Sequence, residues 1–119
     1  MTNLTHYRGD TLSRLITITN SDGTPFDLTG YTAFFTIKNI SDNSDDDSGA
    51  ILAKSWTTHS DPTNGKTLLT ATPAQMSIDE GKYKYDVQIK STVNAITTVI
   101  AGEITILEDI TKRTVWVAI

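Results

Sequence analysis

Residues 79–89, Asp-Glu-Gly-Lys-Tyr-Lys-Tyr-Asp-Val-Gln-Ile, hold the clearest strand pattern in the chain. Every second residue from position 83 to position 89 is aromatic or aliphatic, and the residues between them are charged or carry an amide: the apolar set is Tyr83, Tyr85, Val87 and Ile89. An alternation with a period of two predicts a β-strand that has one buried face and one solvated face.

The start of this strand, Asp79-x-Gly81-x-Tyr83, is typical of a central strand in an immunoglobulin-like sandwich. In such domains the tyrosine ring packs inward and its hydroxyl binds a backbone group a few residues upstream, an arrangement called the tyrosine corner. Antibody domains place a cysteine two residues later, but Tyr85 stands there in this chain. We therefore expect a structural corner formed by Asp79, Gly81, Tyr83 and Tyr85, with aromatic bulk in place of a disulfide.

Length and composition indicate one domain. A chain of 119 residues can bury a core without crosslinks, and this one has no cysteine. The net charge of -4 and the scattered basic residues argue against nucleic acid as a partner. The polar N-terminus has no signal-peptide pattern, and no apolar run is long enough to span a bilayer, so we expect a cytosolic origin and no membrane partner.

The rest of the chain also favours strands. Threonine, isoleucine and valine are frequent, and no segment of eleven or more residues keeps a 3.6-residue period. We predict an all-β, immunoglobulin-like antiparallel β-sandwich of six to eight strands that occupies residues 1–110. The main strands are expected at residues 11–19, 31–38, 51–57, 66–72, 82–90 and 96–107. Residues 4–8 form either a short edge strand or an arm.

Two details concern the core. Phe35, rather than its neighbour Phe34, is expected to point inward. In the last strand four isoleucines share one phase with Gly102, whose missing side chain suggests close approach by another group, such as an aromatic ring from the facing sheet. These isoleucines are Ile96, Ile100, Ile104 and Ile106.

The segment 111–119 is apolar in both phases near its end, where Val115, Trp116 and Val117 are neighbours. Two interpretations remain open for it: a final strand of the sheet, or a contact with a neighbouring subunit. Exposed sheet edges recruit strands unless they are blocked, so these three residues are candidate interaction residues in a homo-oligomer.

The loop at residues 41–49 is rich in aspartate, with Asp42, Asp45, Asp46 and Asp47. Calcium prefers several carboxylates around one point, but this loop lacks the central glycine and the closing glutamate of a helix-loop-helix calcium site. A solvated, mobile hairpin tip is the favoured interpretation, and no metal or other cofactor is expected.

The chain shows no pattern typical of a catalytic site. His6 and His59 are far apart in sequence and have no cysteine partner for zinc, so surface positions are expected for both. There is no Gly-x-Ser-x-Gly segment, and the neighbouring acids Asp79 and Glu80 point in opposite directions on an extended chain. We therefore predict that the protein is not an enzyme and has no catalytic residues.

Trp56 and Trp116 support an alternative function, an extracellular carbohydrate-binding or adhesion module. Sandwich modules of that kind stack sugar rings on exposed aromatic side chains. The competing interpretation is that Trp56 fills the core and Trp116 packs in a terminal strand.

Several turn and corner segments together resemble a known family. They are Arg8-Gly9-Asp10-Thr11, the segment 22–30 (Asp-Gly-Thr-Pro-Phe-Asp-Leu-Thr-Gly), the strand 81–88, and the segment 98–104 (Thr-Val-Ile-Ala-Gly-Glu-Ile). Read together, they are similar to the N-terminal immunoglobulin-like domain of phage baseplate upper proteins, over roughly residues 8 to 111.

The resemblance implies a non-enzymatic structural protein of a phage or prophage tail or baseplate. Its partners would be other tail or baseplate proteins, with homo-oligomers as a further option, and its location would be the virion after assembly in the host cytoplasm. Baseplate upper proteins continue into long C-terminal segments, whereas this sequence stops at Ile119. A small phage tail structural protein therefore fits the length equally well.

Overall fold

The computed structural model describes residues 2–44, 46–108 and 110. These residues form seven strands and one turn of 3-10 helix, and none of them lies in a helix long and apolar enough to cross a membrane. The elements are β1 (Leu4–Tyr7), β2 (Leu12–Thr17), β3 (Thr32–Asn39), β4 (Leu52–Trp56), η1 (Pro62–Asn64), β5 (Lys66–Ala71), β6 (Gly81–Lys90) and β7 (Ile96–Leu107).

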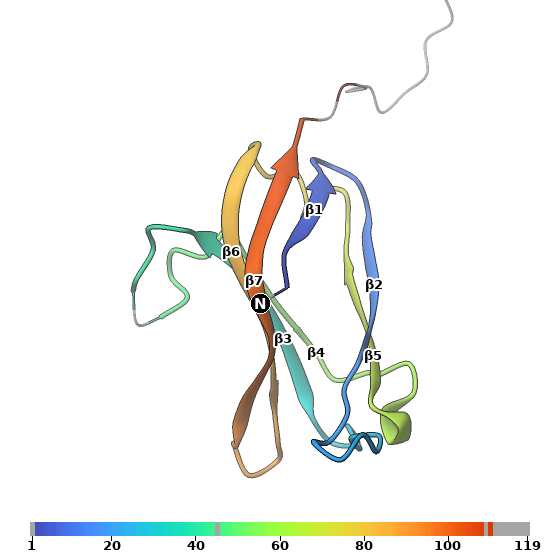
Figure 1. Ribbon diagram of the computed structural model, residues 1–119. Coiled ribbons are helices and arrows are strands. Elements are labelled where there is room, and N and C mark those ends of the chain that lie inside the picture. The colour runs from blue at the N-terminus through green and yellow to red at the C-terminus, as the bar shows by residue number, and fades with distance from the viewer. Residues whose placement is uncertain (1, 45, 109, 111–119) are drawn as a thin grey trace, which may run out of the picture.

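The strands form two sheets that face each other (Figure 1). The larger sheet has the order β1-β7-β6-β3-β4, and the smaller sheet consists of β2 and β5. The prediction of an all-β sandwich with six to eight strands is therefore confirmed. The division of strands is also that of an immunoglobulin-like fold, since the third, sixth and seventh strands share one sheet and the second and fifth form the other.

One strand pair departs from the expected antiparallel arrangement. β1 lies beside β7 in parallel, with Leu4 opposite Ile104 and Tyr7 opposite Leu107. A tight hairpin can join only antiparallel strands, so β1 and β7 cannot be consecutive in the chain. After β1 the chain passes through residues 8–11 into β2 of the other sheet. Residues 4–8, which the sequence left open between edge strand and arm, thus contain an edge strand.

The core lies between the two sheets and is dominated by the inward face of β6. Tyr83, Tyr85, Val87 and Ile89 are all buried, as the period-two pattern predicted. Phe35 is fully buried and contacts the Tyr85 ring edge to face at a centroid distance of 6.1 Å. The choice of Phe35 over Phe34 is confirmed, because Phe34 points to the opposite face of the sheet.

A β-bulge breaks the single phase that the sequence suggested for β7. Val87 faces Ile100 but Gln88 faces Thr98, so Val99 is an extra residue on β7. Because a shift of one residue turns every preceding side chain to the other face, Ile96 is 60% exposed while Ile104 is fully buried. The expectation that Ile96 shares one phase with Ile104 and Ile106 was wrong for this reason.

Close approach at Gly102 is real, but the neighbour is a backbone segment rather than an aromatic ring. A Cβ atom on Gly102 would lie 2.0 Å from the carbonyl oxygen of Thr2. The N–H of Thr2 donates to the carbonyl of Ala101 at 3.0 Å, and the Tyr85 hydroxyl donates to the carbonyl of Thr2 at 2.6 Å. The absent side chain thus lets the N-terminal segment lie directly on β7.

Candidate functional site

The tyrosine corner is a structural site. The Tyr83 hydroxyl donates to the backbone carbonyl of Asp79 at 2.6 Å, and Gly81 has a φ of +146°, a conformation that side chains rarely adopt. The Asp79 carboxylate is 90% exposed and lies 3.6 Å from the Arg8 guanidinium. Asp79 therefore contributes its backbone to the corner, and the side chain that sequence reasoning assigned there points to solvent.

The candidate interaction residues Val115, Trp116 and Val117 lie outside the described residues. The remaining candidate surfaces are the sheet faces, the sheet edges and the loops of the part of the chain that the structure describes.

The outer face of the larger sheet carries a groove of about 780 Å³. Its floor is formed by outward residues of β3, β6 and β7, and one wall is formed by the loop between β3 and β4, which projects to the left in Figure 1. Among the side chains that line the groove are Phe34, Asp86, Lys90, Ile96 and Glu103.

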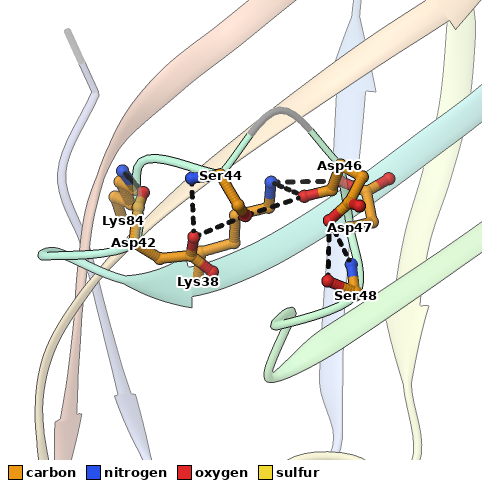
Figure 2. Close-up of polar contacts among 7 residues, drawn as sticks. All are labelled: Lys38, Asp42, Ser44, Asp46, Asp47, Ser48 and Lys84. Atoms are coloured by element: carbon orange, nitrogen blue, oxygen red, sulfur yellow. Dashed lines mark hydrogen bonds and ion pairs between the residues drawn. The ribbon is translucent and has the colours of Figure 1, made fainter.

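The described part of the acidic loop is folded by its own short side chains (Figure 2). The N–H and hydroxyl of Ser44 donate to the Asp42 carboxylate at 3.0 and 2.6 Å. Ser48 donates to Asp46 in the same way at 3.1 and 2.7 Å. The serine hydroxyls, followed by the backbone N–H groups, hold the pKa of both carboxyls below the ordinary value of 3.8.

Two lysines of the larger sheet fasten this loop, as Figure 2 shows. Lys38 donates to the carbonyl of Asp46 at 2.9 Å and lies 3.1 Å from the Asp47 carboxylate. Lys84, which is directly opposite Lys38 on the neighbouring strand, donates to the carbonyl of Asp42. These two lysines were not predicted from the sequence as functional residues, although two outward lysines on neighbouring strands beside a run of aspartates were the available signal.

The described loop residues are mostly exposed, as expected for a solvated hairpin tip, but the loop is also tied to the sheet, which the sequence did not predict. Its residues were too polar to pack in a core, but backbone carbonyls and lysine side chains supply the contacts instead. Within the described ranges, no group of three or more histidine, cysteine, aspartate or glutamate side chains is placed to hold a metal ion.

Asp86 lies on β6 and forms part of the groove floor. Its carboxylate is partly buried and forms no hydrogen bond or ion pair with another described residue. Burial raises the pKa of Asp86, the nearby Asp47 raises it further, and Lys38 opposes both effects. Nearby, the Lys90 ammonium lies 5.8 Å from the centre of the Phe34 ring, a cation–π contact.

Trp56 does not offer the exposed face that sugar binding requires. Its ring is half-buried against the core, and its Nε1–H donates to the Thr67 hydroxyl at 2.7 Å. The Tyr31 carbonyl can only accept, so His59 donates to it from Nε2 at 2.8 Å and accepts from Thr67 at Nδ1 at 2.9 Å. His59 is thus part of a polar chain between strands, in contrast to the surface position expected from the sequence.

The second histidine is close to the first connection of the chain. His6 lies on β1, and its Nε2 is 2.9 Å from the carbonyl oxygen of Asp10. Neither histidine lies beside a carboxylate and a nucleophile in a catalytic arrangement among the described residues.

The fold and these surfaces define an immunoglobulin-like β-sandwich whose exposed features are a polar groove, sheet edges and a fastened loop. The chain belongs to the family described as the BppU N-terminal domain, which matches residues 1–115. This is the family of phage baseplate upper proteins, so the protein is a structural, non-enzymatic component of a phage baseplate and is located in the virion. The family expected from the sequence motifs is confirmed.

Among solved structures, the chain is similar to the immunoglobulin-like domain of mouse leukocyte-associated immunoglobulin-like receptor 1, solved as a strand-swapped dimer. The two share 13% identity over 88% of each chain, with a TM-score of 0.48. Among curated proteins, none matches the chain.

Proposed function

We propose that this domain is an attachment module that binds another tail or baseplate protein through the groove on its larger sheet. Assembly would take place in the host cytoplasm, with no part for nucleic acid, membrane or a cofactor. The observation that carries the proposal is the Asp86 carboxylate, which is partly buried in a concave surface and forms no hydrogen bond or ion pair with the described residues.

The charges of the groove favour a cationic partner residue. Lys38 and Lys84 are occupied by the acidic loop, and Lys90 lies against Phe34. Asp86 and Glu103 form no ion pairs within the described chain, so the groove has acidic groups available to an incoming arginine or lysine. A charge pair that is desolvated at an interface gives orientation and specificity to the contact.

An apolar contact lies beside this charge. Ile96 is 60% exposed because of the β-bulge, and it lines the groove together with Phe34. Interfaces commonly combine a few buried apolar or aromatic anchors with a polar surround. The wall formed by the fastened loop is already in place before binding, which lowers the ordering cost of association.

Binding of the full chain to each purified baseplate protein of the same phage tests the proposal. In biolayer interferometry, Asp86→Lys should weaken the contact at least about tenfold, as expected for a like charge facing the partner's cation. Asp86→Asn should have a smaller effect, and added salt should weaken the parent complex more than the Asp86→Asn complex.

Asp10→Asn is the matched control, because Asp10 is exposed and lies away from the groove residues. It should bind like the parent protein. Unchanged binding by a folded Asp86→Lys variant would show that the groove is not the attachment surface.

A further inference from the structure

The hydrogen-bond pattern of β2 shows that one edge of this strand is free. The N–H of Ile18 donates to the carbonyl of Gly65 at 2.8 Å, which continues the register of β2 against β5. Hydrogen-bonded pairs alternate along an antiparallel ladder, so Leu12, Arg14 and Ile16 direct their backbone groups toward β5. The backbone groups of Ser13, Leu15 and Thr17 consequently point to the opposite side.

No described strand lies on that side. β2 pairs with β5 alone in the smaller sheet, and no hydrogen bond joins the backbone of Ser13, Leu15 or Thr17 to any other residue that the structure describes. All three residues are exposed. The result is an open edge about 14 Å long, at roughly 3.4 Å per residue.

The outer edge of β5, in contrast, is blocked. Lys66 exchanges two backbone hydrogen bonds with Asp61, at 3.0 and 3.1 Å. Farther along the same edge, the Lys54 ammonium donates to the carbonyl of Thr70. A two-stranded sheet would normally have two vulnerable edges, and blocking an edge with a lysine or a short bridge prevents unwanted pairing. Here one edge is blocked and the other is left open.

An apolar pair flanks the open edge on the outer face of the small sheet. Leu15 and Leu68 are directly opposite each other in the ladder and are 57% and 42% exposed. A strand added beside Leu15 would place its own side chains next to this pair, where cross-strand contacts between apolar side chains are stabilising.

The segment that fits this edge is the end of the same chain. Residues 114–119, Thr-Val-Trp-Val-Ala-Ile, have the β-branched and aromatic composition of a strand and are as long as the open edge requires. Ile110 is 89% exposed, so the chain has already left its own sandwich there. The connection at residues 8–11 starts next to the end of β7, where the Arg8 N–H donates to the carbonyl of Leu107 at 2.9 Å.

We propose that residues 114–119 of one copy add as a strand to the open β2 edge of a second copy, and that the exchange is reciprocal. Backbone hydrogen bonds to Ser13, Leu15 and Thr17 provide the pairing, as in other cases of strand addition. Reciprocal exchange gives a closed, two-fold dimer in which both open edges are covered. The contact is separate from the groove on the larger sheet.

Light scattering after size exclusion tests the proposal on the full chain. The parent protein should have the mass of two 13.0 kDa chains. Leu15→Pro removes an N–H that points to the open edge while leaving the β5 ladder intact, and it should reduce the mass to that of one chain. Leu68→Pro is the matched control, because it changes the other leucine of the same pair on the blocked edge; it should remain dimeric.

Trp116→Lys changes the proposed incoming strand and should also give a monomer. Asp86→Asn should leave the mass from light scattering unchanged. This result would show that the dimer contact at the β2 edge does not depend on the groove. Circular dichroism establishes that each variant is folded; if Leu15→Pro does not fold, the double variant Ser13→Pro and Thr17→Pro takes its place.

Three results would each overturn the proposal. They are a monomeric parent protein at about 100 µM, a dimer that persists in a folded edge variant, and a dimer that persists when Trp116 is replaced. The last of these would mean that some other segment occupies the β2 edge.

Discussion

Replacement of Tyr83 by phenylalanine isolates the hydrogen bond of the tyrosine corner. The ring is 8% exposed and its hydroxyl donates to the Asp79 carbonyl at 2.6 Å, so the substitution keeps the packing and removes one donor. The bond is part-buried, and leaving one of its two groups without a partner costs about 1 to 2 kcal/mol. The free energy of unfolding should therefore fall by this amount.

The corresponding change in the midpoint of thermal unfolding follows from chain length. At roughly 2.1 cal/mol/K per residue, a chain of 119 residues has an unfolding entropy of about 250 cal/mol/K. A loss of 1 to 2 kcal/mol then lowers Tm by about 4 to 8 °C. Differential scanning calorimetry, together with urea denaturation, measures both quantities.

Tyr31→Phe is the matched control for Tyr83→Phe. It deletes the same atom from a half-buried ring that packs edge to face on Phe26 at 5.3 Å, but its hydroxyl forms no hydrogen bond with another described residue. Its Tm should stay close to that of the parent. If Tyr83→Phe and Tyr31→Phe have the same Tm, the corner hydrogen bond contributes nothing to stability and the reasoning fails.

Three further predictions concern other parts of the structure. Because burial raises the folded-state pKa of Asp86, its ionisation disfavours folding as the pH rises from the ordinary value of 3.8 through the folded-state pKa. Asp86→Asn should thus have a higher Tm than the parent at pH 7, and equal Tm values across the pH range would contradict this. Thr67→Val keeps the shape of a fully buried side chain but removes the hydroxyl that links Trp56 to His59; a loss of about 2 kcal/mol is expected in urea denaturation, and an unchanged midpoint would argue against the link. Gly102→Ala should displace the N-terminal segment and accelerate amide exchange there, with a cost of about 1 to 3 kcal/mol; unaltered exchange would contradict the close approach.

The sequence alone determined the features that depend on local alternation and turn chemistry. Alternating side chains on a strand point to opposite faces, so the pattern of residues 81–90 was enough to assign the buried side of β6. The spacing Asp79-x-Gly81-x-Tyr83 likewise pointed to the corner, because the tyrosine binds a carbonyl only a few residues away. Turn motifs of this kind also sufficed for the family resemblance.

Only the tertiary structure decided which strands are neighbours and what lies between them. The parallel pairing of β1 with β7, the backbone of Thr2 against Gly102, and the bulge at Val99 all join or shift segments that are distant in sequence. The lysine contacts to the acidic loop and the open edge of β2 have the same origin. Period-two alternation tells which face of a strand is buried, but it carries no information about the partner strand or the register, because those are set by contacts between sheets and along their edges.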